Sequence, residues 1–124
     1  MTDAIDLVRQ YLDAMVARDW KTVRATLAPN VVRRGPYNDN FENRDDYVAF
    51  LEQTFAWMQG YAMDVARVWG TDQRVCAELA ETVTIDGRPL RTAEAIVFDV
   101  ENAMITRVGV FLQASTGPSP DRTG

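Results

Sequence analysis

The sequence predicts an α+β domain in which a curved antiparallel sheet wraps around three N-terminal helices and leaves a pocket inside. Before residue 60 the apolar residues mostly recur with the period of amphipathic helices, whereas after it they alternate with the period of two that is typical of strands. Short turn signals divide the later strands. Helices followed by a run of strands indicate an α+β domain. A curved sheet needs cover on its concave face, and helices that close one end of it would leave a cavity.

Two helices are predicted at the start of the chain. The first spans residues 3–17, where Thr2 or Asp3 can serve as N-cap. The second follows Asp19 as N-cap and ends at Pro29, because proline lacks the N–H that a helix needs. Their apolar faces consist of Ile5, Val8, Leu12 and Met15 in the first helix and Trp20, Val23 and Leu27 in the second.

A short strand and a turn-rich loop precede the third helix. We expect the strand at residues 31–35 and the loop over GPYNDNFEN, residues 35–43. Asn43 then caps a helix that has Asp46 at position N3 and Gly60 at the C′ position. The apolar face of this helix consists of Tyr47, Phe50, Leu51, Thr54, Phe55 and Met58.

Four strands are predicted after the third helix. Asp86-Gly87 indicates one hairpin between them, and Glu101-Asn102-Ala103 indicates a second. We expect residues 1–113 to form a single domain. The last segment, residues 114–124, is small, polar and proline-bearing, so we expect it to be disordered. The predicted strands span residues 61–69, 74–85, 90–100 and 104–113.

The charge of the chain disfavours nucleic acids and membrane surfaces as partners. The net charge is −5, and no stripe of Lys and Arg with interleaved aromatic residues is present. The N-terminus is acidic and lacks the apolar region of a signal peptide, and no apolar run is as long as a bilayer span. We therefore expect a cytoplasmic address.

The absence of histidine limits the chemistry. It removes Ser-His and Cys-His nucleophile systems, most zinc sites and haem ligation by histidine. Cys76 is the one cysteine, and we expect it to be buried and inert. No P-loop or GxGxxG motif is present. Any catalysis is therefore expected to use Asp, Glu, Tyr, Arg or Lys, without a cofactor or a metal.

Three stretches resemble the nuclear transport factor 2-like superfamily, in particular its SnoaL-like and ketosteroid isomerase-like group. They are VRQYLDAMVARDWKTVRATLAPNVV, NRDDYVAFL and DGRPLRTAEAIVFDVENAMITRVGVF, and the likeness covers about residues 3–113. The resemblance implies a single SnoaL-like domain, folded as a cone-shaped barrel with an apolar pocket and usually dimeric. Members include ketosteroid isomerase, scytalone dehydratase, limonene epoxide hydrolase and polyketide cyclases, and others only bind or dimerise, so the fold does not assign a reaction.

Two activities of the family can be compared residue by residue. Tyr11 matches a tyrosine of ketosteroid isomerase, and Glu94, in TAEAIVF, matches its protonated carboxyl. The isomerase base would stand at Gly35, before Pro36, so that base is missing. Limonene epoxide hydrolase would need an Asp-Arg-Asp set, and the corresponding places hold Thr82, Ala80 and Val110. The match is to the scaffold more than to either chemistry.

Strand alternation suggests that two carboxyls converge. It places Glu94 on one face with Thr92, Ile96 and Phe98, and Glu81 on one face with Leu79 and Val83. A hairpin at Asp86-Gly87 would set Glu81 nearly opposite Thr92 and diagonal to Glu94. Like charges in an apolar site push one pKa up, which separates an acid from a base. Two alternatives are open: Glu81 could face solvent, and Glu94 could be a structural carboxyl tied to Tyr11 or an arginine.

Arg33 and Arg34 lie on opposite faces of the first predicted strand, and the resemblance favours Arg33 as the inward one. It could pair with Glu81 or Glu94 or orient an oxyanion, although a surface salt bridge is the common fate of an arginine. Tyr11 could donate a hydrogen bond to a substrate, or it could simply pack in the core.

The remaining candidates line the predicted pocket. Tyr37 and Asp39 could form a lid, with Asp39 as a substitute base, although a solvated turn is the alternative. Trp57, Met58, Tyr61 and Met63 could line the opening or a dimer face, or only pack. The substrate-binding set is Tyr37, Asp39, Leu51, Phe55, Met58, Met63, Leu79, Val83, Ile96, Phe98, Val108, Val110 and Leu112.

The sequence thus favours a cofactor-independent acid–base enzyme of the isomerase, cyclase or hydrolase type that acts on a small hydrophobic molecule. Glu94 and Glu81 would form the acid–base pair, with Tyr11 as donor and Arg33 as orienting group. One alternative is a non-catalytic protein that binds a small hydrophobic ligand. Another is a dimeric interaction module with a vestigial pocket, which predicts a filled interior. The resemblance and outward Ala93, Ala95 and Val97 lead us to expect a homodimer through the convex face of the sheet.

Overall fold

The computed structural model describes residues 3–113, so the segment predicted to be disordered, residues 114–124, lies outside the described residues. The helices of the described part are α1 (Ala4–Val16), α2 (Trp20–Thr26) and α3 (Arg44–Trp57). None of them is long and apolar enough to cross a membrane. The first two and the third flank a short strand in the chain, as the sequence predicts.

A six-stranded sheet forms the second layer, and its strand order is β2-β1-β6-β5-β4-β3. This arrangement confirms the α+β class. Two details differ from the prediction. The sheet is mixed, because β1 pairs parallel to β6, and it is an open sheet with β2 and β3 at its edges. The strands are β1 (Leu27–Arg34), β2 (Asn40–Phe41), β3 (Gln59–Gly70), β4 (Arg74–Ile85), β5 (Arg88–Glu101) and β6 (Met104–Leu112).

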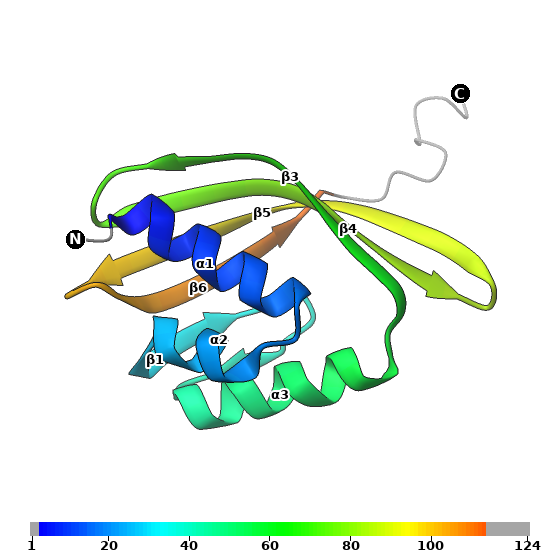
Figure 1. Cartoon of the computed structure of the whole chain (residues 1–124), viewed down its shortest axis with the longest axis horizontal. Coiled ribbons are helices and arrows are strands. Elements are labelled where there is room, and N and C mark those ends of the chain that lie inside the picture. The colour runs from blue at the N-terminus through cyan, green and yellow to red at the C-terminus, as the bar shows by residue number, and fades with distance from the viewer. Residues whose placement is uncertain (1–2, 114–124) are drawn as a thin grey trace.

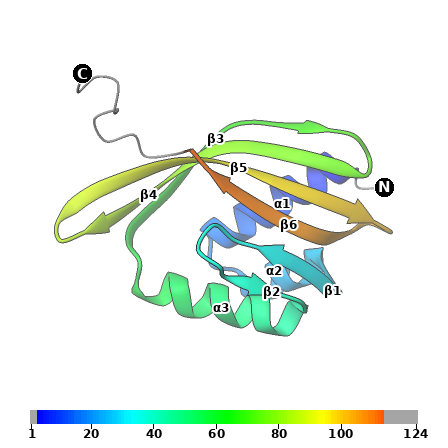
Figure 2. The ribbon, with the colours of Figure 1, turned by 180° about the vertical axis from the view of Figure 1, so that it is seen from behind.

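The helices all cover one face of the sheet. Figure 1 shows α1 crossing in front of the strands and α3 lying below them, and Figure 2 shows the same strands from behind, in front of the helices. Register shifts interrupt the β3–β4 pairing between Val65 and Arg67 and the β5–β6 pairing between Asp99 and Val100. Such bulges increase strand bending and twist, which helps to curve the sheet toward the helices.

Side-chain caps begin each helix where the sequence predicts. Asp3 accepts a hydrogen bond from the Asp6 amide (2.7 Å), and Asn43 accepts one from the Asp46 amide (2.8 Å). Asp19 likewise caps α2. These contacts satisfy amides that a helix leaves free at its first turn.

The end of α2 differs from the prediction. The helix stops at Thr26, and β1 begins at Leu27, so Pro29 lies within the strand. The register of β1 against β6 is irregular between Leu27 and Val32. A proline is tolerated there because this part of the strand is not continuously paired.

The hairpin turns follow the sequence closely. Asp86 (φ 52°) and Gly87 (φ 77°) connect the paired residues Ile85 and Arg88, and Asn102 (φ 52°) and Ala103 (φ 60°) form the second turn. Both turns therefore have two residues in the left-handed region, which is the geometry of a tight hairpin loop. The second turn is one residue shorter than predicted.

Two local predictions are corrected. The loop GPYNDNFEN contains the short strand β2, whose Phe41 and Asn40 pair with Arg33 and Arg34 of β1. Gly60 has a left-handed φ of 61°, but α3 ends at Trp57 with Met58 as C-cap, so the glycine is the second residue of β3 and does not close the helix. A side chain at this position would collide with Thr84.

The core lies between the concave sheet face and the helices. Its largest fully buried side chains include Tyr11, Tyr47 and Phe98, and the rings of Tyr11 and Phe98 meet edge to face at 5.6 Å. Cys76 is half-buried on the other face of β4 and is free, and burial raises the pKa of its thiol. The core continues beneath α1, where Leu7, Val8 and Leu12 are buried and do not line the cavity described below.

Ile105 and Ile85 allow a matched test of this core. Ile105 is 0% exposed and Ile85 is 47% exposed. We expect Ile105→Ala to lower the free energy of unfolding by about 2–5 kcal/mol because it leaves a cavity, and Ile85→Ala to lower it by less than about 1 kcal/mol. Chemical denaturation of both variants measures the difference, and equal losses would contradict this placement of the core.

Candidate functional site

A cavity of about 290 Å³ lies between the concave face of the sheet and the helices α1 and α3. Its volume is close to the lower end of the range of about 300–1,000 Å³ for small-molecule sites. Most of its lining is apolar or aromatic, and the polar groups come from α1, β1, the loop after β1, α3, and strands β3 to β5. The polar and charged side chains in the lining are Tyr11, Arg33, Tyr37, Asp39, Tyr47, Thr54, Tyr61, Glu81, Thr92 and Glu94.

Strand register brings the two glutamates into this cavity. Glu81 of β4 pairs with Thr92 of β5, and Glu94 follows two positions later on the same face. This is the diagonal arrangement that the sequence predicts, and both glutamates line the cavity. The alternative in which Glu81 faces solvent is therefore wrong.

Glu94 and Glu81 form a coupled acid pair. Glu94 is only 9% exposed. Its burial, its hydrogen bond with Glu81 and the like charge of Glu81 raise its pKa to about 9, and the positive charge of Arg33 opposes this rise. At neutral pH Glu94 therefore keeps its proton and can donate it to Glu81. A carboxyl that is neutral at pH 7 can act as an acid.

Tyr61 supports the charged member of the pair. Its hydroxyl donates a hydrogen bond to Oε2 of Glu81. Burial, followed by the charge and hydrogen bond of Glu81, raises the pKa of Tyr61, so the phenol stays protonated and remains a donor. Glu81 thus accepts hydrogen bonds from two neighbours, as a carboxylate does.

A second polar chain starts at the loop after β1 and reaches α1. Arg33 donates to Oδ2 of Asp39 (2.7 Å) and to the hydroxyl of Tyr47 (3.1 Å). The hydroxyls of Tyr47 and Tyr11 share a short hydrogen bond of 2.5 Å. Burial and Tyr47 raise the pKa of Tyr11, so its hydroxyl is kept as a donor. The hydrogen-bonded chain therefore leads from Asp39 through Arg33 and Tyr47 to Tyr11.

The structure settles the two predictions for arginine. Arg33 is 8% exposed and points inward, whereas Arg34 lies on the other face and pairs with Glu42. A surface salt bridge for Arg33 is thus wrong. Its partner is Asp39 instead of Glu81 or Glu94, because the loop after β1 folds back over the strand.

Most residues of the predicted substrate-binding set line the cavity, and three do not. Leu79 and Phe98 lie further along the same strand faces and pack in the solid core, and Met63 packs against that core from the edge strand β3. The members that line the cavity are Tyr37, Asp39, Leu51, Phe55, Met58, Val83, Ile96, Val108, Val110 and Leu112.

Tyr47 is a polar residue of the site that sequence reasoning missed. It was assigned to the apolar face of α3, which is correct, but nothing in the sequence places its hydroxyl between Arg33 and Tyr11. Thr82 and Ala80, the places compared with the epoxide hydrolase set, alternate with Glu81 and do not line the cavity. Within residues 3–113, no three His, Cys, Asp or Glu side chains group as metal ligands would.

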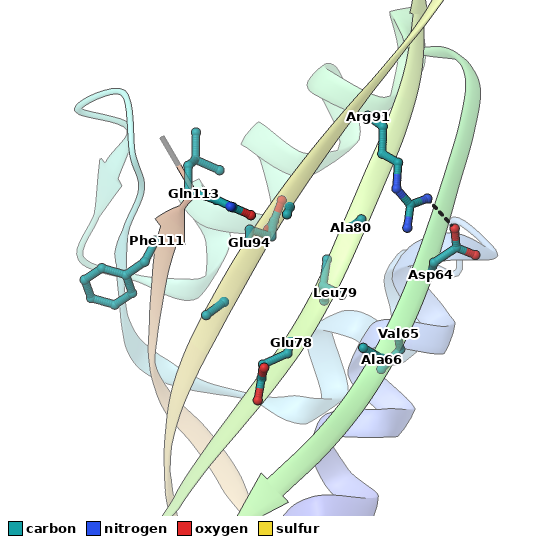
Figure 3. A pocket seen from close by; sticks show the side chains of 13 residues that line it. Asp64, Val65, Ala66, Glu78, Leu79, Ala80, Arg91, Glu94, Phe111 and Gln113 are labelled. Carbon is teal, nitrogen blue, oxygen red and sulfur yellow. Dashed lines mark hydrogen bonds and ion pairs between the residues drawn. The ribbon is translucent and has the colours of Figure 1, made fainter. Parts of the chain in front are cut away.

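The opposite face of the sheet carries an open groove of a different character. Its floor is made of small residues, among them Ala80, Ala93 and Ala95. Figure 3 shows its rim, where Arg91 contacts Asp64 and where Phe111 projects from β6. Both members of the ion pair are well exposed. Glu94 borders this groove as well, on the strand that separates the groove from the cavity.

Comparisons with known proteins agree with this architecture. A family model described as SnoaL-like domain matches residues 8–108. The chain is similar to an LEH-like epoxide hydrolase of M. tuberculosis, with 20% identity, a TM-score of 0.79 and coverage of 89% of this chain and 82% of that one. No curated protein sequence matches.

Two further solved structures have the same fold. An NTF2-like protein of unknown function from Burkholderia pseudomallei has 20% identity, a TM-score of 0.81 and coverage of 91% and 92% of the two chains. A Catenulispora acidiphila protein with a ketosteroid isomerase-like fold, in complex with trimethylamine, has 13% identity, a TM-score of 0.77 and coverage of 86% and 84%. These likenesses concern the fold alone.

The raised pKa of Glu94 predicts how stability depends on pH. The folded chain holds a proton that the unfolded chain releases above an ordinary carboxyl pKa of 4.5, so the native chain loses stability as pH rises from there to about 9. Glu94→Gln has no such loss. Between pH 5 and pH 8, we expect the free energy of unfolding of this variant to rise by about 4 kcal/mol relative to that of the native chain.

Glu78→Gln is the matched control on the outer face. Hydrogen bonds from Trp69 and Arg67 lower the pKa of Glu78, so its contribution is present above its ordinary pKa and lost only as pH falls. Chemical denaturation of the native chain and both variants at pH 5 and pH 8 measures these free energies of unfolding. If the difference in free energy of unfolding between Glu94→Gln and the native chain does not change with pH, Glu94 is not protonated in the folded chain.

Proposed function

This chain belongs to the SnoaL-like domain family, and from the acid pair in its cavity we propose that it is a cofactor-independent acid–base enzyme acting on a small hydrophobic molecule. The reaction is of the isomerase, cyclase or hydrolase type. The single observation that carries the proposal is a carboxyl held neutral beside a second carboxyl, in a cavity large enough for a ligand.

Glu94 and Glu81 are proposed as the acid and its proton-accepting partner. Glu94 gives its proton, or a strong hydrogen bond, to an oxygen of the ligand as negative charge develops there. Glu81 sits next to it, and the Tyr61 hydroxyl fixes the orientation of its carboxylate. Proton exchange between the two glutamates would reset the pair after each turnover.

Tyr11 and Arg33 are proposed as a donor and an orienting group. The charge on Arg33 polarises the Tyr47 hydroxyl, which is bonded to Tyr11. A hydroxyl at the end of such a chain is a stronger hydrogen-bond donor than an isolated one. Tyr11 would thus assist Glu94 in stabilising charge on a ligand oxygen.

The closest rival is a non-catalytic protein that binds a small hydrophobic ligand, which the mostly apolar lining favours. A carrier, however, needs no desolvated acid pair, and such a pair costs stability at neutral pH. The interaction module with a vestigial pocket predicts a filled interior with Glu81 outside. The cavity and the Glu81 that lines it argue against that module.

A test of turnover separates enzyme from carrier. We expect the native chain to transform at least one member of a panel of small hydrophobic ketones and epoxides, and Glu94→Gln to lower that rate by about 100-fold or more. Glu78→Gln, with its exposed carboxyl on the outer face, should keep the native rate. Ligand-induced thermal stabilisation without turnover would favour the carrier, and an active Glu94→Gln variant would remove Glu94 from the mechanism.

We also propose that the chain forms a homodimer through the outer sheet face. Phe111 is 61% exposed and Trp69 is 49% exposed on this face, beside the floor of small alanines. Exposed apolar patches of this kind commonly mark interfaces between proteins. Small residues on the floor would let a second sheet approach closely.

Ala95 lies in the middle of the outer face, between its strand partners Glu78 and Phe111. We expect the native chain to sediment as a dimer at micromolar concentration and Ala95→Arg to sediment as a monomer. Ala49→Arg makes the same change at an exposed position of α3. This variant is the control and should remain dimeric. A monomeric native chain would contradict the proposed dimer.

A further inference from the structure

We propose that the substrate is an elongated neutral amphiphile, with an oxygen-bearing head at Glu94 and an apolar tail that leaves the cavity past Tyr37 and Leu90. The inference rests on the proposed function and names the class of its substrate. Both residues of the exit line the cavity, yet Tyr37 is 78% exposed and Leu90 is 52% exposed. They mark the place where the cavity meets solvent.

This mouth of the cavity is apolar. Among the described lining residues, only Pro36, Tyr37 and Leu90 are exposed, and none of them carries a charge. A single exposed apolar residue is ordinary on a protein surface. Here three of them, from two separate segments, border one cavity, and apolar surface gathered in this way commonly marks a binding site. A ligand that ended inside the cavity would leave all three in water, whereas an apolar tail in the mouth would cover them.

One strand face leads from the acid pair to the mouth. Glu94, Thr92 and Leu90 alternate along β5, and all three line the cavity. At about 3.3 Å for each of the four residues between them, Leu90 lies about 13 Å from Glu94 along the strand. A carbon–carbon bond is about 1.5 Å long, so an extended chain with its head at Glu94 needs about nine atoms or more to reach Leu90.

The volume of the cavity gives a similar limit. At about 30 Å³ for each water-sized group, a cavity of about 290 Å³ holds about ten non-hydrogen atoms. A longer molecule with its head at Glu94 must therefore continue through the mouth. Leu90 pairs with Val83 of β4, which also lines the cavity, so two apolar side chains flank the tail on the side of the hairpin. This hairpin projects at the right of Figure 1.

The loop after β1 holds Tyr37 at the other side of the mouth. The Tyr37 amide donates to Oδ1 of Asp39 (2.9 Å), and Oδ2 of Asp39 accepts from Arg33 (2.7 Å). The Asp39 side chain is only 15% exposed, so the solvated turn considered from the sequence is wrong for this residue. Because the backbone of Tyr37 is already held, a ligand that covers its ring pays little entropy for ordering the loop.

Gly35 leaves the room that these contacts need. A Cβ atom built on Gly35 would collide with the carboxylate of Asp39. Gly35 does not have a positive φ, so what glycine provides here is space and not an unusual backbone conformation. Pro36 restricts the backbone between Gly35 and Tyr37 further, because its ring fixes φ. The loop thus has a defined conformation, and the aromatic side chain that it presents to solvent is Tyr37.

Chain length in a homologous series tests the inference. The probes are the linear 1-alkanols from hexanol to dodecanol, and isothermal titration calorimetry gives their dissociation constants. We expect the affinity of the native chain to rise about fourfold per methylene up to nonanol, which is about as large as the cavity, because each methylene is fully buried. From nonanol to dodecanol we expect about twofold per methylene, because the mouth covers only part of the tail.

Variants at the mouth should affect the long alkanols alone. Tyr37→Ala and Leu90→Ala should bind hexanol like the native chain and dodecanol about threefold more weakly each, and the double variant should bind dodecanol about eightfold more weakly. Val16→Ala is the matched control, because Val16 is 44% exposed and does not line the cavity, so it should bind every alkanol like the native chain. Melting temperatures identify variants that fail to fold.

The outcomes separate this inference from the proposed function. If the shorter alkanols bind but the affinity stops rising at nonanol, the inference is wrong, whereas a ligand within the cavity and the proposed function stand. A folded double variant that binds dodecanol as tightly as the native chain also overturns the inference, as does a native chain that binds no alkanol. If the long alkanols bind as expected and no member of the ketone and epoxide panel is transformed, the acid–base function fails and the elongated molecule stands as the ligand of a carrier.

Discussion

The site depends on one electrostatic constraint, the burial of the Glu94 carboxyl beside the half-buried carboxyl of Glu81, with which it shares a proton. Glu94 and Glu81 point from neighbouring strands into an apolar hollow, where both cannot be charged at neutral pH. The proton therefore stays on Glu94, and Glu81 is satisfied by hydrogen bonds from Glu94 and Tyr61. Strand register fixes this pairing, because a slip of one residue would move either side chain to the opposite face of the sheet.

The rest of the fold gives this acid pair a ligand-sized space. Bulges help to bend the sheet, α1 covers one part of its concave face, and α3 packs beside β1 and β2. The cavity lies between the two helices and the sheet. The parallel pairing of β1 with β6 has a separate consequence. It sets the loop that follows β1 on the far wall, where Arg33 holds Asp39 toward the interior. Two sets of acidic groups thus face one cavity from segments distant in the chain.

The sequence predicts the local features of this structure better than the long-range ones. Residue chemistry predicts the helix caps at Asp3, Asp19 and Asn43 and the hairpin turn at Asp86-Gly87. This turn fixes the pairing of β4 with β5, which places Glu81 diagonally opposite Glu94. The parallel β1–β6 pairing is invisible to periodicity, since its strands are far apart in the chain. The prediction for the partner of Arg33 is wrong for a different reason: Asp39 is only six residues away, but the sequence does not show that the loop after β1 folds back over the strand. Leu79 and Phe98 share the faces of Glu81 and Glu94, but alternation does not say where along a strand the solid core gives way to the cavity.

The balance of charge in the cavity also bears on the kind of ligand it admits. Arg33 is the only cationic side chain among its described lining residues, and its two terminal nitrogens are engaged by Asp39 and Tyr47. An anionic ligand would therefore meet no free cation and would face the charge of the glutamate pair. A neutral molecule with one oxygen near Glu94 and Tyr11 meets donors there and an apolar wall elsewhere. The arrangement that keeps Glu94 protonated would thus also select, under the proposed function, for a neutral, hydrophobic ligand with a hydrogen-bond acceptor.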